Sequence, residues 1–109
     1  MSTFGDAGLA AYAASKHGVA GLTKCLASEL GEFGITANFI QPGAILTDIT
    51  RDSIEKYPEM EVFWRQKSAL GRWGEPTDIA PVALFLASDL GAFVSGTGLV
   101  ADGAAMQAP

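Results

Sequence analysis

The first third of the chain follows a helical period. Over residues 12–33 the apolar positions recur at spacings of three and four, which places them on one helical face. These positions are Val19, Leu22, Leu26 and Leu30. Gly31 and Gly34 predict where this helix ends. Cys25 lies inside the apolar pattern, so its thiol is predicted to be packed in the core.

Two later stretches predict strands. Residues 35–41 are short, apolar and rich in β-forming residues, and Pro42-Gly43 stops them. A strand buried on both faces, as in parallel sheets, has this composition. Residues 98–101 predict a second short strand near the end of the chain.

The region between the two strands predicts helices. Residues 44–70 are the most polar and charged stretch and predict one or two short helices, broken near Pro58. Residues 76–87 predict another helix, with a proline in its first turn and a bend at Pro81. The order of elements therefore predicts an α/β fold with two parallel strands joined by right-handed crossovers. Two such strands do not make a stable sheet by themselves, so the pattern is that of half a fold.

Composition narrows the class of protein. The 109 residues form at most one domain, and 49% hydrophobic with 17% charged residues indicates a folded chain. A net charge of −5 without a basic cluster argues against nucleic acid and anionic membranes as partners. The apolar stretches are too short to span a bilayer and no signal peptide precedes them, so we expect a soluble, cytoplasmic protein. One cysteine and one histidine allow neither an intrachain disulfide nor a metal site.

The segment from Ala11 to Gly18 carries the candidate chemistry. Tyr12 and Lys16 are four residues apart, so both point from one face of the first helix. A phenol in water titrates near ~10, too high for proton transfer at neutral pH, and a neighbouring cation favours the phenolate. The small residues around them leave room for a flat ligand. The pair therefore predicts a proton donor and acceptor beside a carbonyl or alcohol.

Four motifs in order resemble one known family. The Tyr12–Lys16 pair is followed by the strand and turn of residues 38–48, the Gly-Arg-Trp-Gly-Glu-Pro stretch of residues 71–76, and a glycine-rich end. This order resembles the C-terminal half of the classical short-chain dehydrogenase/reductases, especially the 3-oxoacyl reductase and sugar- or cyclic-alcohol-dehydrogenase type. The resemblance runs over residues 5–106 and implies the C-terminal half of a Rossmann-like, doubly wound parallel sheet.

The resemblance implies a role for particular residues. Tyr12 matches the general acid/base that exchanges a proton with the substrate oxygen, and Lys16 matches the lysine that binds the nicotinamide ribose and favours the ionised tyrosine. A nicotinamide cofactor, NAD or NADP, would supply the hydride. The turn that closes over the nicotinamide is matched by Pro42 and Gly43. Backbone groups next to Ile45 would hold the carboxamide, and the Thr47 hydroxyl would lie near it or near the diphosphate.

Other residues are expected to have structural parts or none. Phe63, Trp64 and Leu70 fall where the family places its substrate-covering helices, although aromatic residues at this spacing are more often core or interface. Arg72 and Trp73 match a structural region and are given no catalytic role. His17 is expected to be solvated or in contact with its own helix.

Departures from the family pattern leave gaps. Ser2 is the single candidate for the catalytic serine, and it requires a loop shortened by about three residues. The family's active-site asparagine and phosphate-binding glycines have no counterpart, because no G-x-G-x-x-G follows an opening strand. The substrate and the choice between NAD and NADP cannot be read from this stretch.

Two hypotheses of different classes follow. The first is part of an oxidoreductase that interconverts an alcohol and a ketone with a nicotinamide cofactor, acting on a small-molecule substrate as a homo-oligomer. The chain would then be a partial domain, residues 1–109, without the nucleotide-binding half. The second is a non-catalytic piece that docks on itself or on a full-length relative, motivated by the missing nucleotide cradle and an exposed strand edge.

Overall fold

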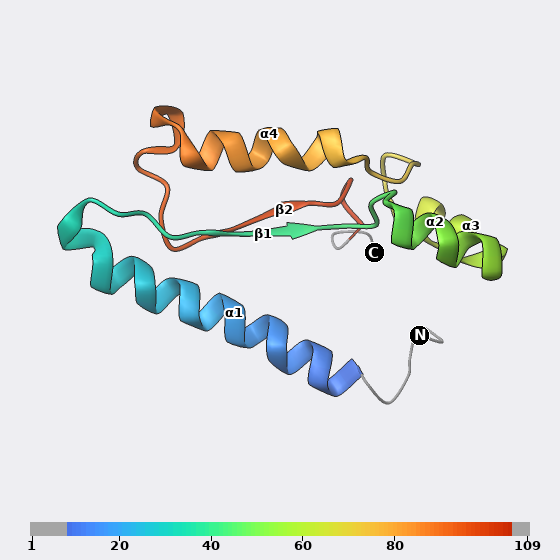
Figure 1. Ribbon diagram of the computed structural model, residues 1–109, viewed down its shortest axis with the longest axis horizontal. Helices are drawn as coiled ribbons and strands as arrows, with labels where there is room; N and C mark the ends of the chain where they lie inside the picture. Colours follow the sequence, from blue (N-terminus) through green and yellow to red (C-terminus); the bar gives the residue numbers. More distant parts are fainter. Residues whose placement is uncertain (1–8, 106–109) are drawn as a thin grey trace. The chain divides into compact units, whose positions relative to one another are not determined.

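The computed structural model describes residues 9–105 (Figure 1). Ser2, the candidate for the catalytic serine, lies outside the described residues. The described chain begins with a long helix and alternates afterwards between short strands and helices. In chain order the elements are α1 (Leu9–Leu30), a 3-10 turn η1 (Gly31–Phe33), β1 (Phe39–Pro42), α2 (Asp48–Lys56), α3 (Pro58–Lys67), α4 (Pro76–Ala87), a 3-10 turn η2 (Asp89–Gly91) and β2 (Gly98–Ala101).

The helix α1 begins at Leu9 rather than Tyr12 and ends at Leu30, directly before Gly31, the first of the two glycines that predict its end. Gly34 adopts a left-handed conformation with φ of 74°, and its N–H donates to the carbonyl of Gly31 at 2.9 Å. A residue without a Cβ takes this conformation at little cost, which ends the 3-10 turn η1 that follows α1. The prediction for Cys25 is wrong, because its side chain is exposed. Its apolar neighbour Leu22 is also 60% exposed, so the helical period located an apolar face that the described chain does not cover.

The two strands pair in parallel, as predicted. The N–H of Phe39 donates to Thr97, and four residues later the N–H of Gly43 donates to Ala101, each at 3.1 Å, so both strands advance in the same direction. The first strand is shorter than the predicted 35–41. Asn38 explains the difference, because its side-chain amide donates to the Val94 carbonyl and its side-chain oxygen accepts the N–H of Thr97. Before Phe39 these side-chain bonds join the two segments beside one backbone bond, from the Gly96 N–H to the Ala37 carbonyl at 2.7 Å.

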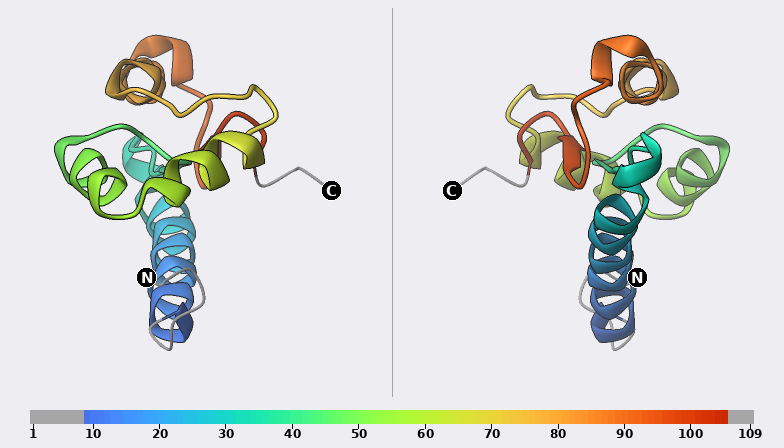
Figure 2. Two further views of the ribbon diagram at one scale, coloured as in Figure 1. Left: turned by 90° about the vertical axis from the view of Figure 1, so that its right-hand side faces the viewer. Right: turned by 90° about the vertical axis from the view of Figure 1, so that its left-hand side faces the viewer.

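The helices between the strands match the predicted pattern. α2 and α3, the green and yellow-green helices of Figure 2, contact each other. Tyr57 separates them, and Pro58 begins α3. α4 has the predicted bounds, with Pro76 in its first turn and Pro81 in its interior. No helix within residues 9–105 has the length and apolar character needed to cross a membrane.

The described residues divide into two compact units. The first comprises residues 9–39 together with Ala92–Gly98, and the second comprises Ile40–Gly91 together with residues 99–105. Trp73 is the one large apolar residue of the described chain that is buried, at 7% exposure, and it lies in the second unit. Its indole Nε1–H donates to the Glu61 carbonyl at 3.0 Å, which ties the turn before α4 to α3.

Candidate functional site

The first turns of α1 bring Tyr12 and Lys16 together. The Lys16 ammonium nitrogen lies 5.3 Å from the centroid of the Tyr12 ring, a distance at which a cation and an aromatic face attract each other. The Tyr12 side chain is 59% exposed, so its hydroxyl is open to a ligand. Ser15 donates its hydroxyl to the Tyr12 carbonyl at 2.8 Å and stays within the helix. The helical spacing therefore produces the predicted juxtaposition without help from any distant segment.

His17 takes the structural part expected of it. Its ring is exposed, and Nδ1 lies 2.9 Å from the carbonyl of Ala13 one turn earlier. Because a carbonyl only accepts, this nitrogen carries the proton in that bond. Within residues 9–105, no group of three or more His, Cys, Asp or Glu side chains could hold a metal ion.

The turn after β1 needs glycine for a close approach. Gly43 packs against Asp102, and a Cβ added at Gly43 would lie 2.6 Å from the Asp102 Cβ and 2.8 Å from its Cα. Its N–H donates to the Ala101 carbonyl at 3.1 Å. Two chain segments far apart in sequence thus meet here at backbone distance.

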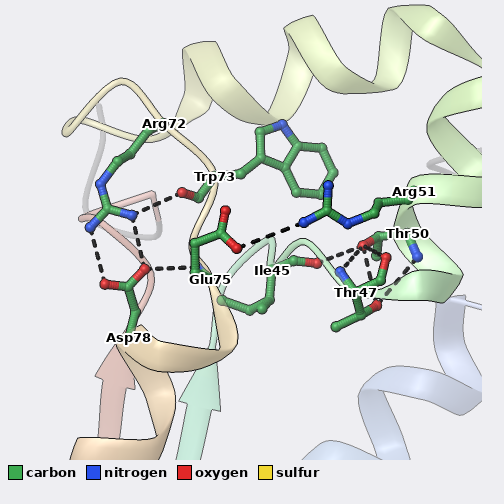
Figure 3. Close-up of polar contacts among 8 residues, drawn as sticks. All are labelled: Ile45, Thr47, Thr50, Arg51, Arg72, Trp73, Glu75 and Asp78. Carbon is green, nitrogen blue, oxygen red and sulfur yellow. Dashed lines mark hydrogen bonds and ion pairs between the residues drawn. The ribbon is translucent and has the colours of Figure 1, made fainter.

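Ile45 is held by backbone contacts on one side and a hydroxyl on the other. The N–H of Gly74 donates to the Ala44 carbonyl at 2.8 Å, and the N–H of Leu46 donates to the Gly74 carbonyl at 2.9 Å. These two bonds form the Ile45–Gly74 bridge, a short parallel pairing outside the named strands. The Thr50 hydroxyl donates to the Ile45 carbonyl at 2.7 Å (Figure 3). Peptide groups alternate along an extended segment, so the Ile45 N–H also points away from Gly74.

Thr47 begins α2 as its N-cap. Its hydroxyl accepts the N–H of Thr50 at 3.3 Å, and the Thr50 hydroxyl accepts the N–H of Thr47 at 2.7 Å. This reciprocal pair is a capping box. The Thr50 proton is used at Ile45, so in the 3.2 Å contact between the two hydroxyls Thr47 is the donor. A ligand oxygen can replace that long contact and accept the Thr47 proton.

Sequence reasoning missed an ion pair on the turn before α4. Arg72 binds Asp78 through both arms of its guanidinium, with Nη1 at 2.9 Å and Nη2 at 3.2 Å from the two carboxylate oxygens. The hydrogen bonds from Arg72 and from the Glu75 N–H lower the pKa of Asp78 to about 2, and the same carboxylate raises the pKa of Arg72. Asp78 in the first turn of a predicted helix is a capping signal that could have indicated part of this arrangement.

The predicted site residues fall into two sets. Tyr12 and Lys16 belong to the first unit, whereas Gly43, Ile45 and Thr47 belong to the second, as does Pro42. Within the second set, the Ile45 N–H and the Thr47 hydroxyl are donors of the kind that a carboxamide or phosphate oxygen accepts. This donor chemistry fits the nicotinamide end of a dinucleotide cofactor.

The family is shown by comparison with known proteins. Residues 2–104 match a family model described as enoyl-(acyl carrier protein) reductase, which covers nearly the whole chain. The chain belongs to the classical short-chain dehydrogenase/reductase family. Its α/β architecture with a parallel sheet is accordingly a part of the Rossmann-like fold of that family, as predicted.

Relatives and solved structures agree with this assignment. The chain is 40% identical over 92 residues to L-rhamnose 1-dehydrogenase (NAD(P)(+)) of Sphingomonas sp. strain SKA58, which covers 84% of this chain and 36% of that protein. It is 40% identical over 103 residues to the 3-oxoacyl-acyl-carrier-protein reductase FabG of Chlamydia pneumoniae, covering 94% of this chain and 40% of that one. The structure of 4-hydroxyisoleucine dehydrogenase complexed with NADH superimposes with a TM-score of 0.84 at 36% identity, covering 92% and 41%.

The chain corresponds to only part of each relative. It spans about two fifths of the length of the relatives it matches. By their names these relatives are dehydrogenases or a reductase; the rhamnose dehydrogenase is named with NAD(P)(+), and the 4-hydroxyisoleucine dehydrogenase is complexed with NADH. What the whole protein does is therefore inferred from the site residues that this stretch contributes.

Proposed function

We propose that this chain contributes the acid/base residues of an NAD(P)-dependent oxidoreductase that interconverts an alcohol and a ketone. The observation that carries the proposal is the Tyr12–Lys16 pair, with the ammonium 5.3 Å from the ring centroid and the phenol exposed. Membership of the family supports it, because the resemblance implies that Tyr12 and Lys16 match the family's acid/base tyrosine and its lysine.

Tyr12 moves the proton in this proposal. In the reducing direction its hydroxyl donates a proton to the oxygen of the carbonyl, and in the oxidising direction the phenolate accepts the alcohol proton. The Lys16 ammonium, 5.3 Å from the centroid of the Tyr12 ring, supplies the positive charge of the pair. A bound nicotinamide cofactor supplies or accepts the hydride. Ile45 and Thr47 would hold its carboxamide end, with Pro42 and Gly43 forming the turn beside it.

The choice of substrate stays open between the classes that the relatives represent. Their names cover a sugar, a 3-oxoacyl thioester and an amino-acid alcohol. A panel of these three classes, assayed with NAD(H) and NADP(H), would identify the substrate class and the cofactor. We further infer a cytoplasmic location from sequence composition, which cell fractionation would test.

Replacing Tyr12 tests the function. In the intact protein, Tyr12→Phe is expected to lower turnover by about 10²- to 10⁴-fold, since the ring remains and the transferable proton is lost. Cofactor binding, measured by the fluorescence of the reduced nicotinamide, is expected to persist. Tyr57→Phe is the matched control, because Tyr57 is also an exposed tyrosine and lies at the end of α2. A Tyr12→Phe protein with unchanged turnover would contradict the proposal.

The apolar face of α1 favours a second candidate, a non-catalytic docking piece. Val19, Leu22 and Leu26 are all exposed in the described chain, and a contiguous face of this kind marks an interaction surface. We propose that this apolar face binds a second copy of this chain or a full-length relative. The same contact between two copies would make the proposed enzyme a homo-oligomer. Leu22→Glu is expected to abolish self-association in size-exclusion chromatography with light scattering. Lys24→Glu is the control, because Lys24 lies two residues from Leu22 and so points away from the apolar face. A monomeric unmodified chain would contradict this candidate.

A further inference from the structure

The two peptide groups that flank Gly74 form hydrogen bonds on both sides of the chain. On one side, the Gly74 N–H donates to the Ala44 carbonyl and the Gly74 carbonyl accepts the N–H of Leu46. On the other side, the Trp73 carbonyl accepts from Arg72 Nη1 at 3.0 Å, and the Glu75 N–H donates to Asp78 Oδ2 at 2.7 Å. Each of the four polar groups around Gly74 therefore has a named partner.

The Arg72–Asp78 pair supplies both partners on the second side. A guanidinium presents several N–H donors in one plane, so Arg72 binds the carboxylate with two nitrogens and the Trp73 carbonyl with one of them (Figure 3). Asp78 in turn uses one oxygen for both Arg72 and the Glu75 N–H. The orientation of the peptides around Gly74 is thus coupled to this single ion pair.

The backbone of Gly74 is in turn hydrogen-bonded to the residues on either side of Ile45. A Cβ at Gly74 would lie 2.5 Å from the Ile45 Cδ1, so the two segments meet without room for a side chain. A second contact reaches the same turn from α2, because Arg51 Nη2 lies 3.8 Å from Glu75 Oε2. Turning the peptides at Gly74 would therefore move the backbone of residues 44–46.

We propose that Arg72 is a positioning residue for the cofactor, which acts through Asp78 and the peptides around Gly74 to fix the backbone of Ile45. The inference rests on the proposed function, since it takes Ile45 as a contact of the nicotinamide carboxamide. Arg72 touches neither substrate nor cofactor in this assignment. Its effect is on cofactor affinity and leaves the acid/base step at Tyr12 unchanged.

The test combines hydrogen exchange with cofactor binding in the intact protein. In Arg72→Gln, the amides of Leu46 and Gly74 are expected to exchange about tenfold faster without cofactor, whereas the Tyr57 amide, bonded within α2, keeps its rate. The dissociation constant of NADH or NADPH, whichever the unmodified protein binds, is expected to rise about fivefold. Turnover at saturating cofactor should change by less than about twofold. Arg72→Lys should recover only part of the loss, because an ammonium cannot replace the planar fork.

Arg65→Gln is the matched control. It breaks an ion pair of the same unit and the same 2.9 Å distance, between Arg65 and Glu61, that has no bond to the peptides around Gly74. Unchanged exchange at Leu46 and Gly74 in Arg72→Gln would overturn the proposal, as would faster exchange with unchanged cofactor affinity or equal effects of Arg65→Gln. If the unmodified protein binds neither nicotinamide, the proposed function fails and this assignment fails with it. The exchange data, recorded without cofactor, would then still show whether the Arg72 coupling exists.

Discussion

The helix that carries Tyr12 and Lys16 differs from the segment that carries Ile45 in the range of its contacts. Around Tyr12, the bonds of Ser15 and His17 reach back only three or four residues within α1. Around Ile45, the backbone is bonded to Gly74, almost thirty residues later in the chain. Local geometry is sufficient for the first region, whereas the second exists only when distant segments meet.

This difference teaches where substitutions act. A change in the first turns of α1 leaves the helix intact and alters the chemistry that its side chains present. A change near Gly43, Ile45 or Gly74 disturbs packing between segments and alters stability and backbone position first.

Replacing a glycine by alanine should change the free energy of unfolding in opposite directions in the two regions. Gly43→Ala is expected to destabilise the protein by about 1–3 kcal/mol, because the new Cβ would meet backbone as well as side-chain atoms of Asp102. Gly21→Ala in α1 meets nothing within 4 Å and should stabilise the protein by about 0.5–1 kcal/mol, since alanine favours the helix. Urea unfolding of the two variants measures both effects. If both variants shift the free energy of unfolding equally and in the same direction, the proposed difference between the two regions is wrong.

Within the second region, removing a hydroxyl that joins distant residues should cost more stability than removing one that bonds only within its own helix. Thr50→Val keeps the shape of the side chain but leaves the Ile45 carbonyl and the Thr47 N–H without their partner, at a cost of about 1 kcal/mol or somewhat more. Ser53→Ala removes only a local bond to Ile49 within α2. Thermal unfolding should therefore show a larger loss for Thr50→Val. The interpretation of Thr50 as a link between segments is wrong if Ser53→Ala costs as much.

The smallest expected effect is the pH dependence of Asp78. Its pKa falls from 3.8 to about 2 in the folded chain, so its contribution is complete above about pH 4 and is lost as pH falls through about 2. The charged groups that face it directly or through Glu75 are Arg72, Glu75 and Arg51. The pair is exposed, and salt should weaken it further.

The measurement is the difference in urea midpoint between the unmodified protein and Asp78→Asn. The difference in urea midpoint should not change with pH around neutrality, and it should shrink towards zero in strong acid. In an Arg72→Gln background the Asp78→Asn difference should already be small at neutral pH, because the main cause of the lowered pKa is gone. A difference that persists unchanged down to about pH 2 would show that Asp78 does not act through its charge.

Sequence periodicity located most of the elements. α4 and β2 have the predicted bounds, and the break between α2 and α3 lies at Pro58. The strand prediction at 35–41 began too early, since the sequence does not reveal that Asn38 would bond Val94 and Thr97 through its side chain. The packed thiol predicted at Cys25 is exposed, because a helical period indicates which face is apolar and not what covers it.

The sequence by itself determined the Tyr12–Lys16 pair, the end of α1 before Gly31, the start of α4 at Pro76, and the family, because each depends on residues a few positions apart or on motif order. Only the tertiary structure decided that Arg72 and Asp78 bind the two peptides around Gly74, and that Gly74 in turn holds Ile45. The physical reason is that such bonds depend on which distant segments meet, and their register is set by packing between elements rather than by any period along the chain.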